Sequence, residues 1–236
     1  MIRAVLFDLD DTLFDHRESA AEALRRLQHA HDCFRAVPFD EFERQHSVLL
    51  EEFHPEVVSG RLGMDQARRE RFRRLFERYG VTAGDDLCAG TASFYRSEYL
   101  DARRAMAGAA ALLEAVREVA AVGIVSNNML QEQKEKLQHC QLAAHVDVLI
   151  VSEEAGVSKP DPAIFRVALD ALGVRPDEAV MLGDSWSADI VGARAAGVRA
   201  VWFNPLRLPS PEPQLGVPEV HALTPVADVL RVLLIS

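Results

Sequence analysis

The sequence has little of what marks membrane-spanning, exported or disulfide-rich proteins. No apolar run in the 236 residues approaches the roughly 18 that a transmembrane helix needs. The apolar stretch near the N-terminus is cut short by Asp8, Asp10 and Asp11, and no small-residue cleavage site follows it. We therefore expect no secretory signal peptide and a cytoplasmic location. The three cysteines are widely spaced, which favours reduced, buried thiols over a disulfide framework or a zinc site.

The chain also lacks an excess of positive charge. It carries 26 basic and 36 acidic residues, a formal net charge of −10. Because an acidic surface repels nucleic acid and anionic lipid, we expect neither nucleic acid nor a membrane as a partner. A small anionic substrate remains compatible if a metal ion holds it locally. The composition suits a globular core that carries a smaller second domain, and monomer and homodimer are both compatible with it.

Two patterns divide the chain. Residues 2–7 form a short apolar segment that predicts a buried strand. Residues 16–100 then carry apolar side chains at helical spacing, broken by prolines and glycines, and predict about four helices and no strand. From about residue 105 short apolar strands alternate with helices. The strands are expected at residues 121–125, 146–151, 179–182 and 199–203, and the helices at 108–119, 130–140, 163–172 and 187–196.

Such alternation is typical of a parallel sheet covered by helices on both faces. The sequence therefore predicts an α/β fold with a Rossmann-like parallel sheet in a core of residues 1–15 and 101–236. Residues 16–100 are predicted to form an inserted all-helical cap domain. A proline-rich loop at residues 205–218 precedes the last segment, residues 226–235.

Polar side chains follow the predicted strands. Asp8 and Asp10 follow the first strand, Ser126 the second, Lys159 comes after the third and Asp184 follows the fourth. The carboxyl ends of parallel strands line one crevice, so these residues are expected to meet. Neighbouring carboxylates repel unless a cation lies among them, and oxygen ligands suit Mg²⁺. A metal ion, a lysine and a hydroxyl together suit phosphoryl transfer, whose transition state spreads negative charge over oxygens.

Four segments resemble the signatures of the haloacid dehalogenase superfamily. Asp8-Leu9-Asp10-Asp11-Thr12 resembles the first, Ser126-Asn127 the second and Lys159-Pro160 the third. Gly183-Asp184-Ser185-Trp186-Ser187-Ala188-Asp189 resembles the fourth. One D-x-D-x-T motif would be weak evidence, but all four occur in order after predicted strands. The resemblance covers nearly the whole chain and is weakest in the helical insertion.

The resemblance implies a role for each matching residue. Asp8 is the expected nucleophile, which forms an aspartyl-phosphate. Asp10 is expected to protonate the leaving oxygen and then to activate water. Lys159 is expected to neutralise charge on Asp8 and the phosphate. Mg²⁺ is expected between a side-chain oxygen of Asp8, the backbone carbonyl of Asp10, and Asp184.

The remaining matches imply binding or support. Thr12, Ser126 and Asn127, together with Lys159, are expected on the substrate side, where Thr12 also organises the first motif. Asp189 is expected to support the site, either as a metal ligand through water or by orienting Lys159.

Reaction type and substrate are less sharply implied. Dehalogenases of the superfamily lack the second aspartate of the first motif, so Asp10 favours hydrolysis of a phosphate monoester. Residues 151–160 look most like nucleoside 5′-monophosphatases, while N-acylneuraminate 9-phosphatases and phosphoglycolate phosphatases look similar there. The expected order is therefore nucleotide, then sugar phosphate or phosphoglycolate, then haloacid. Two alternatives to a hydrolase belong to other functional classes: a mutase, and a non-catalytic binding protein on the same scaffold.

One helix of the insertion is rich in arginine. The run consists of Arg68, Arg69, Arg71, Arg73, Arg74 and Arg78, with Arg61 just before it. We expect a solvated helix face on which arginines pair with Glu70 and Glu77. An anion-steering surface is the alternative.

Overall fold

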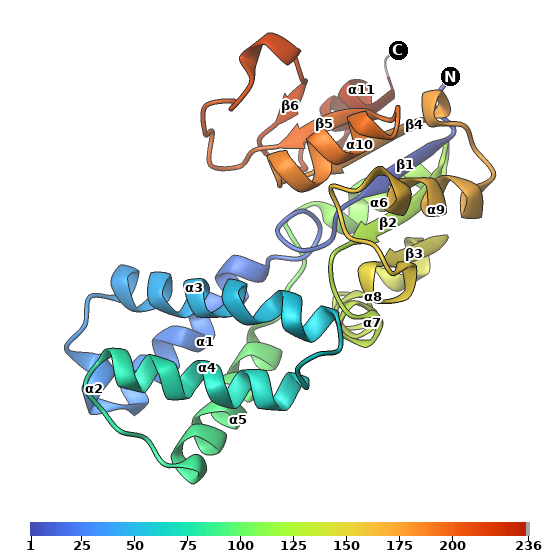
Figure 1. Cartoon of the computed structure of the whole chain (residues 1–236). Helices are drawn as coiled ribbons and strands as arrows, with labels where there is room; N and C mark the ends of the chain where they lie inside the picture. Colours follow the sequence, from blue (N-terminus) through green and yellow to red (C-terminus); the bar gives the residue numbers. More distant parts are fainter. Residues whose placement is uncertain (235–236) are drawn as a thin grey trace. The chain divides into compact units, whose positions relative to one another are not determined.

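The computed structural model describes residues 1–234 (Figure 1). It separates into two compact units, of which one contains residues 1–15 and the chain from Arg104 onward, and the other contains His16–Arg103. Ile235, at the end of the last predicted segment, lies outside the described residues. No helix among residues 1–234 combines the length and the apolar character needed to cross a bilayer.

The first unit is built on a six-stranded sheet in which every neighbouring pair is parallel. The strands are β1 (Ala4–Phe7), β2 (Ala121–Ser126), β3 (Val148–Val151), β4 (Ala179–Gly183), β5 (Arg199–Phe203) and β6 (Glu219–Val220). Their order is β3-β2-β1-β4-β5-β6, which confirms the predicted Rossmann-like α/β fold. Phe7 at the end of β1 is in register with Ile124 of β2 and Leu182 of β4. The carboxyl ends of these three strands therefore lie at the same edge of the sheet, where β2 and β4 extend slightly beyond β1.

Helices cover both faces of this sheet. They are α6 (Ala109–Arg117), α7 (Leu130–His139), α8 (Ser152–Ala155), α9 (Pro162–Leu172), α10 (Gly192–Ala195) and α11 (Val226–Leu234). Short 3-10 turns lie at Ala143–His145, Pro176–Glu178 and Pro213–Leu215. Helix α9 packs on β2, β3 and α10, whereas α6 packs on β2 and α11.

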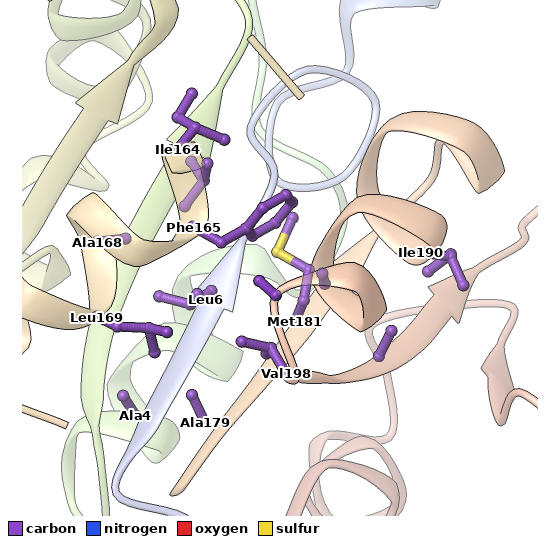
Figure 2. Close-up of a cluster of buried hydrophobic side chains, with 14 of the residues drawn as sticks. Ala4, Leu6, Ile164, Phe165, Ala168, Leu169, Ala179, Met181, Ile190 and Val198 are labelled. Carbon is purple, nitrogen blue, oxygen red and sulfur yellow. The ribbon is translucent and has the colours of Figure 1, made fainter. Parts of the chain in front are cut away.

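Strand β1 is buried on both faces, which is why its sequence is apolar without alternation. Figure 2 shows Ala4 and Leu6 beside Phe165, Leu169 and Met181, in the cluster that joins the sheet to α9. Full burial of one such large side chain contributes roughly 1.5–3 kcal/mol. This packing anchors the strand whose carboxyl end carries Asp8.

Two local features were not predicted from the sequence. The helix expected over residues 187–196 begins instead as a π-helical turn, Trp186–Val191, which continues into α10. The backbone N–H of Ile190 reaches back five residues to the carbonyl of Ser185, and this wide turn lets the Asp189 side chain fold back onto the end of β4. Strand β6 was not expected, because two residues are too few for an apolar period to show.

The second unit is helical. It contains α1 (His16–Ala30), α2 (Asp32–Arg35), α3 (Phe39–Val58), α4 (Met64–Arg78) and α5 (Asp85–Ala102). Helix α1 packs on α5, and α4 packs on both α3 and α5. Aromatic rings fill one end of the bundle, where Phe34 stacks on Phe76 with 4.7 Å between ring centroids and lies 4.9 Å from Phe42. Such aromatic burial explains how the unit forms a core of its own.

Candidate active site

The loop after β1 sends two aspartates in different directions. The backbone N–H of Asp8 donates to the carbonyl of Leu182, 2.9 Å away, so Asp8 still belongs to the sheet. The chain then turns sharply, with Asp11 in the left-handed region at φ 62° and its N–H bonded to the carbonyl of Phe14. Leu9 and Leu13 are fully buried and anchor the turn. Asp8 thus stays deep in the fold, while Asp10 projects from the turn.

Lys159 lies between two carboxylates. Its Nζ is 2.5 Å from Oδ1 of Asp8 and 2.6 Å from Oδ1 of Asp189, and all three side chains are buried. Burial by itself disfavours the charged ammonium. The carboxylates of Asp189 and Asp8 outweigh that effect and raise the pKa of Lys159. Lys159 therefore stays positively charged, which is what binding an anionic group beside Asp8 requires.

Asp8, Asp184 and Asp189 each offer a carboxylate oxygen within 4.8 Å of the others. Burial raises the pKa of Asp8 well above its usual range, although Lys159 opposes the rise, and the charges of Asp189 and Asp184 add to it. The negative charge of Asp8 is thus incompletely compensated by Lys159. A divalent cation among these oxygens would supply the missing positive charge, and an all-oxygen donor set suits Mg²⁺.

Both oxygens of Asp189 are already engaged. One binds Lys159, and the other accepts the backbone N–H of Ser185 at 2.9 Å. This approach needs a glycine at position 183, because a Cβ there would lie 2.3 Å from Oδ2 of Asp189. Of the two roles expected for Asp189, the geometry favours orientation of Lys159. Asp8 and Asp184 are then the carboxylates of the trio that suit direct metal contact.

Asp10 is held by a separate set of donors. Its Oδ1 lies 2.5 Å from Nζ of Lys136, while its Oδ2 accepts from Nε2 of Gln133 at 2.9 Å and from Nδ2 of Asn128 at 3.3 Å. Gln133 also donates to the hydroxyl of Ser126 at 2.6 Å. Helix α7 and the segment before it thus tie Asp10 to the end of β2. The Asp10 side chain keeps 25% of its surface exposed, so it retains access to solvent.

Lys136, Gln133 and Asn128 belong to none of the motifs in the sequence, and only the structure places them at the site. Helix α7 is polar nearly all round, so its pattern does not show which side it buries. Lys136 is nonetheless 4% exposed, with Nζ 5.1 Å from the centroid of the Phe14 ring. One signal in the sequence could have identified two of them. Gln133 and Lys136 are three residues apart and so lie on the same side of the helix that follows Ser126 in the chain.

Asn127 and Thr12, which are both expected on the substrate side, differ in their hydrogen bonds. Asn127 donates from Nδ2 to the carbonyl of Lys159 at 2.8 Å, and its Oδ1 accepts the N–H of Lys159 at 2.7 Å. Its side chain thereby fixes the backbone that carries Lys159. Thr12 is fully buried, and its hydroxyl has no hydrogen-bond partner among residues 1–234. Substrate contacts by Thr12, Ser126 and Asn127 remain predictions.

The sequence from residue 2 to residue 197 matches the haloacid dehalogenase-like hydrolases. The chain belongs to this family. It is 34% identical over 215 residues to the ribulose-1,5-bisphosphate 5-phosphatase of Halopiger xanaduensis, with 87% of this chain and 86% of that protein covered. It is 29% identical over 224 residues to the pyrimidine 5′-nucleotidase YjjG of Escherichia coli, covering 93% and 95%.

Solved structures of the family have the same architecture as this haloacid dehalogenase-like hydrolase. The hydrolase YfnB of Bacillus subtilis, described as bound to magnesium, superposes with a TM-score of 0.74 at 26% identity and covers 97% of this chain and 98% of that one. The 2-haloacid dehalogenase of Pseudomonas syringae pv. Tomato DC3000 gives 0.66 at 28% identity and covers 98% of each chain. Proteins named as a phosphatase, a nucleotidase and a dehalogenase thus all occur among those similar to this hydrolase.

Proposed function

We propose that this hydrolase is a Mg²⁺-dependent phosphatase that hydrolyses a small phosphate monoester through an aspartyl-phosphate on Asp8. The observation that carries the proposal is the contrast between two aspartates two positions apart. Asp8 is buried against Lys159, whereas Asp10 is partly exposed and held by Lys136 and Gln133. Lys159 and a bound cation would keep Asp8 ionised as the nucleophile, while its partial exposure lets Asp10 exchange protons as the general acid–base.

In the first step a carboxylate oxygen of Asp8 attacks phosphorus, and the bond from phosphorus to the ester oxygen breaks. The protonated carboxyl of Asp10 gives its proton to that departing oxygen. In the second step Asp10, now a carboxylate, takes a proton from water as the water oxygen attacks phosphorus. The bond from phosphorus to the Asp8 oxygen breaks at the same time, so inorganic phosphate leaves and Asp8 is regenerated as a carboxylate. Lys159 stabilises the negative charge beside Asp8 throughout.

Mg²⁺ would be held by carboxylate oxygens of Asp8 and Asp184, with the backbone carbonyl of Asp10 as a further expected ligand. When bound it would neutralise negative charge on the phosphoryl oxygens and reduce the repulsion between that group and Asp8. The raised pKa of Asp8 supports this assignment, since it marks a carboxylate that lacks full compensation.

A nucleoside 5′-monophosphate is the first candidate substrate, supported by the near full-length similarity to a pyrimidine 5′-nucleotidase. A sugar phosphate is the second, supported by the similarity to a ribulose-1,5-bisphosphate 5-phosphatase. Dehalogenation is less well supported, because a halide leaves without needing the proton that Asp10 can provide. Substrate selection by the helical unit as a cap, and a cytoplasmic location, belong to the same proposal.

The deciding experiment measures phosphate release from a panel of esters with and without Mg²⁺. The panel holds p-nitrophenyl phosphate, nucleoside monophosphates, sugar phosphates and phosphoglycolate. We expect Mg²⁺-dependent release by the wild type and none by Asp8→Asn, which should keep the circular dichroism spectrum of the wild type. Turnover by Asp8→Asn near the wild-type rate would overturn the nucleophile assignment. If the folded protein releases phosphate from no ester when Mg²⁺ is supplied, the result would favour the alternatives. These are a dehalogenase that acts on a haloacid, a mutase, and a non-catalytic binding protein.

A further inference from the structure

The helical unit buries an arginine that has no counter-ion. Arg71 lies on the inner stripe of α4 with Ala67 and Leu75, and it is 7% exposed. Among residues 1–234 no carboxylate pairs with its guanidinium and no acceptor takes a hydrogen bond from it, and its Nε is fully buried. A guanidinium presents five N–H donors and stays charged at any ordinary pH. Arg71 thus offers a complete donor set without an acceptor.

Aromatic side chains and a second unpaired polar group surround this arginine. The Cζ of Arg71 lies 5.4 Å from the ring centroid of Phe72 and 5.6 Å from that of Tyr95. His46 of α3 lies against the Tyr95 ring at 4.9 Å, is fully buried, and leaves its Nε2 without a partner among the described residues. We call Arg71, His46, Phe72 and Tyr95 the Arg71 cluster.

The protonation of the Arg71 cluster follows from its burial. Desolvation holds the pKa of His46 well below its usual range, and the charges of Arg71 and His16 lower it further. His46 is therefore neutral, with one ring nitrogen that donates and one that accepts. Arg71 is the one charged member, so the cluster carries a net positive charge in a desolvated environment.

Carboxylates are abundant around the other arginines of α4. Arg73 pairs with Glu70 and Asp85, and Arg74 pairs with Glu52 and Glu70. These ion pairs confirm the expected solvated and paired helix face for Arg73 and Arg74. Arg71 differs because it is buried and has no ion pair among the described residues. Burial of an unpaired charge is costly, and attraction to the faces of aromatic rings offsets only part of that cost. A costly group with no structural partner is typical of a ligand site.

We propose that the Arg71 cluster binds a small oxyanion, a carboxylate or phosphate group. The planar guanidinium would bind two oxygens at once, and the buried, unpartnered Nε2 of His46 would donate a further hydrogen bond in the tautomer that carries its proton there. Such an anion could be free in solution, or it could be a second anionic group on the phosphate ester. The second case rests on the proposed function and would make the preferred substrates doubly anionic.

The first experiment measures thermal unfolding in sodium sulfate and in sodium chloride of equal ionic strength. It compares the wild type with Arg71→Met, Arg71→Lys and the control Arg69→Met, which removes an exposed arginine from the same helix. Sulfate should raise the Tm of the wild type and of Arg69→Met, because a ligand that binds the folded state stabilises it. Arg71→Met should unfold at the wild-type temperature or higher in chloride. In sulfate it should keep only the general stabilisation that an excluded salt gives any folded protein, and lose the additional rise in Tm that binding produces.

Arg71→Lys keeps the charge but not the planar fork, so its apparent affinity for sulfate should fall about tenfold. An equal sulfate response in the wild type, Arg71→Met and Arg71→Lys would overturn the proposal. So would a Tm of Arg71→Met several degrees below that of the wild type in chloride, since this would show that Arg71 supports the bundle. Failure of Arg71→Met to fold would count against the proposal in the same way.

A second experiment separates the two sources of the anion. It compares KM for phosphoglycolate with KM for ethyl phosphate, which lacks the carboxylate. If the substrate carries the anion, Arg71→Met should raise KM for phosphoglycolate about tenfold or more and leave that for ethyl phosphate unchanged. Unchanged KM values together with a lost sulfate response support a free oxyanion. If neither ester is hydrolysed, the proposed function fails while the sulfate measurement still tests the Arg71 cluster.

Discussion

Nζ of Lys136 lies 2.5 Å from Oδ1 of Asp10, although 126 residues separate the two in sequence. Gln133, one turn earlier on the same helix, donates to the other oxygen of the same carboxylate. The proposed acid–base is therefore held at both oxygens by a single helix. This arrangement leaves Asp8 and Asp10 with separate cations, Lys159 and Lys136.

Replacing Lys136 with methionine should lower kcat by about 10- to 100-fold and leave KM nearly unchanged. The reason is that a misplaced acid–base affects the chemical steps more than ground-state binding. Steady-state kinetics on the best ester of the panel measures this. Lys134→Met removes an exposed lysine of the same helix and should behave as the wild type. A rise in KM with kcat unchanged would place Lys136 in substrate binding instead.

Gly183→Ala should impair both activity and stability. The added Cβ would meet the side chain of Asp189, which must then move away from Lys159. We expect the free energy of unfolding to fall by about 1–3 kcal/mol and phosphate release to fall at least about tenfold. Chemical denaturation and turnover assays measure the two effects. Gly90→Ala in α5 has open space around its Cβ and should gain about 0.5–1 kcal/mol. Equal behaviour of the two variants would refute the close approach to Asp189.

Mg²⁺ should stabilise the wild type more than Asp184→Asn. Binding to the folded state raises Tm by mass action, and the variant loses one of the charged ligands proposed for the ion. Thermal unfolding in millimolar MgCl₂ and in EDTA gives the comparison without any need for turnover. Glu154→Gln, which removes an exposed carboxylate, should keep the full response. The assignment of Asp184 fails if all three proteins respond alike.

The stability of the protein should decline in mild acid partly through His46. The pKa of His46 is depressed in the folded state, so as pH falls below the ordinary value of 6.5 the unfolded chain binds a proton that the folded chain does not. Between that value and about pH 5.5 the loss should be on the order of 1 kcal/mol. His46→Gln should flatten the dependence of unfolding free energy on pH. His29→Gln, at an exposed position, should leave it as in the wild type.

Local patterns were sufficient for much of the fold. The apolar runs at residues 121–125 and 199–203 became β2 and β5 nearly residue for residue, because a buried parallel strand must be apolar on both sides. Strand β6 escaped prediction because its pairing with β5 depends on the chain's return after the proline-rich loop. The π-helical turn escaped because it depends on Asp189 packing against Gly183, a contact that a helical period does not contain.

Sequence by itself determined the family and the order of the polar residues along one crevice, since Asp8, Ser126, Lys159 and Asp184 each follow a predicted strand. The tertiary structure alone decided which cation each aspartate meets. It also decided that Asn127 holds the backbone of Lys159 and that Arg71 turns inward while its neighbours pair at the surface. Lysine, glutamine and arginine are ordinary residues of exposed helices, so only their packing shows which of them are buried and what they hold.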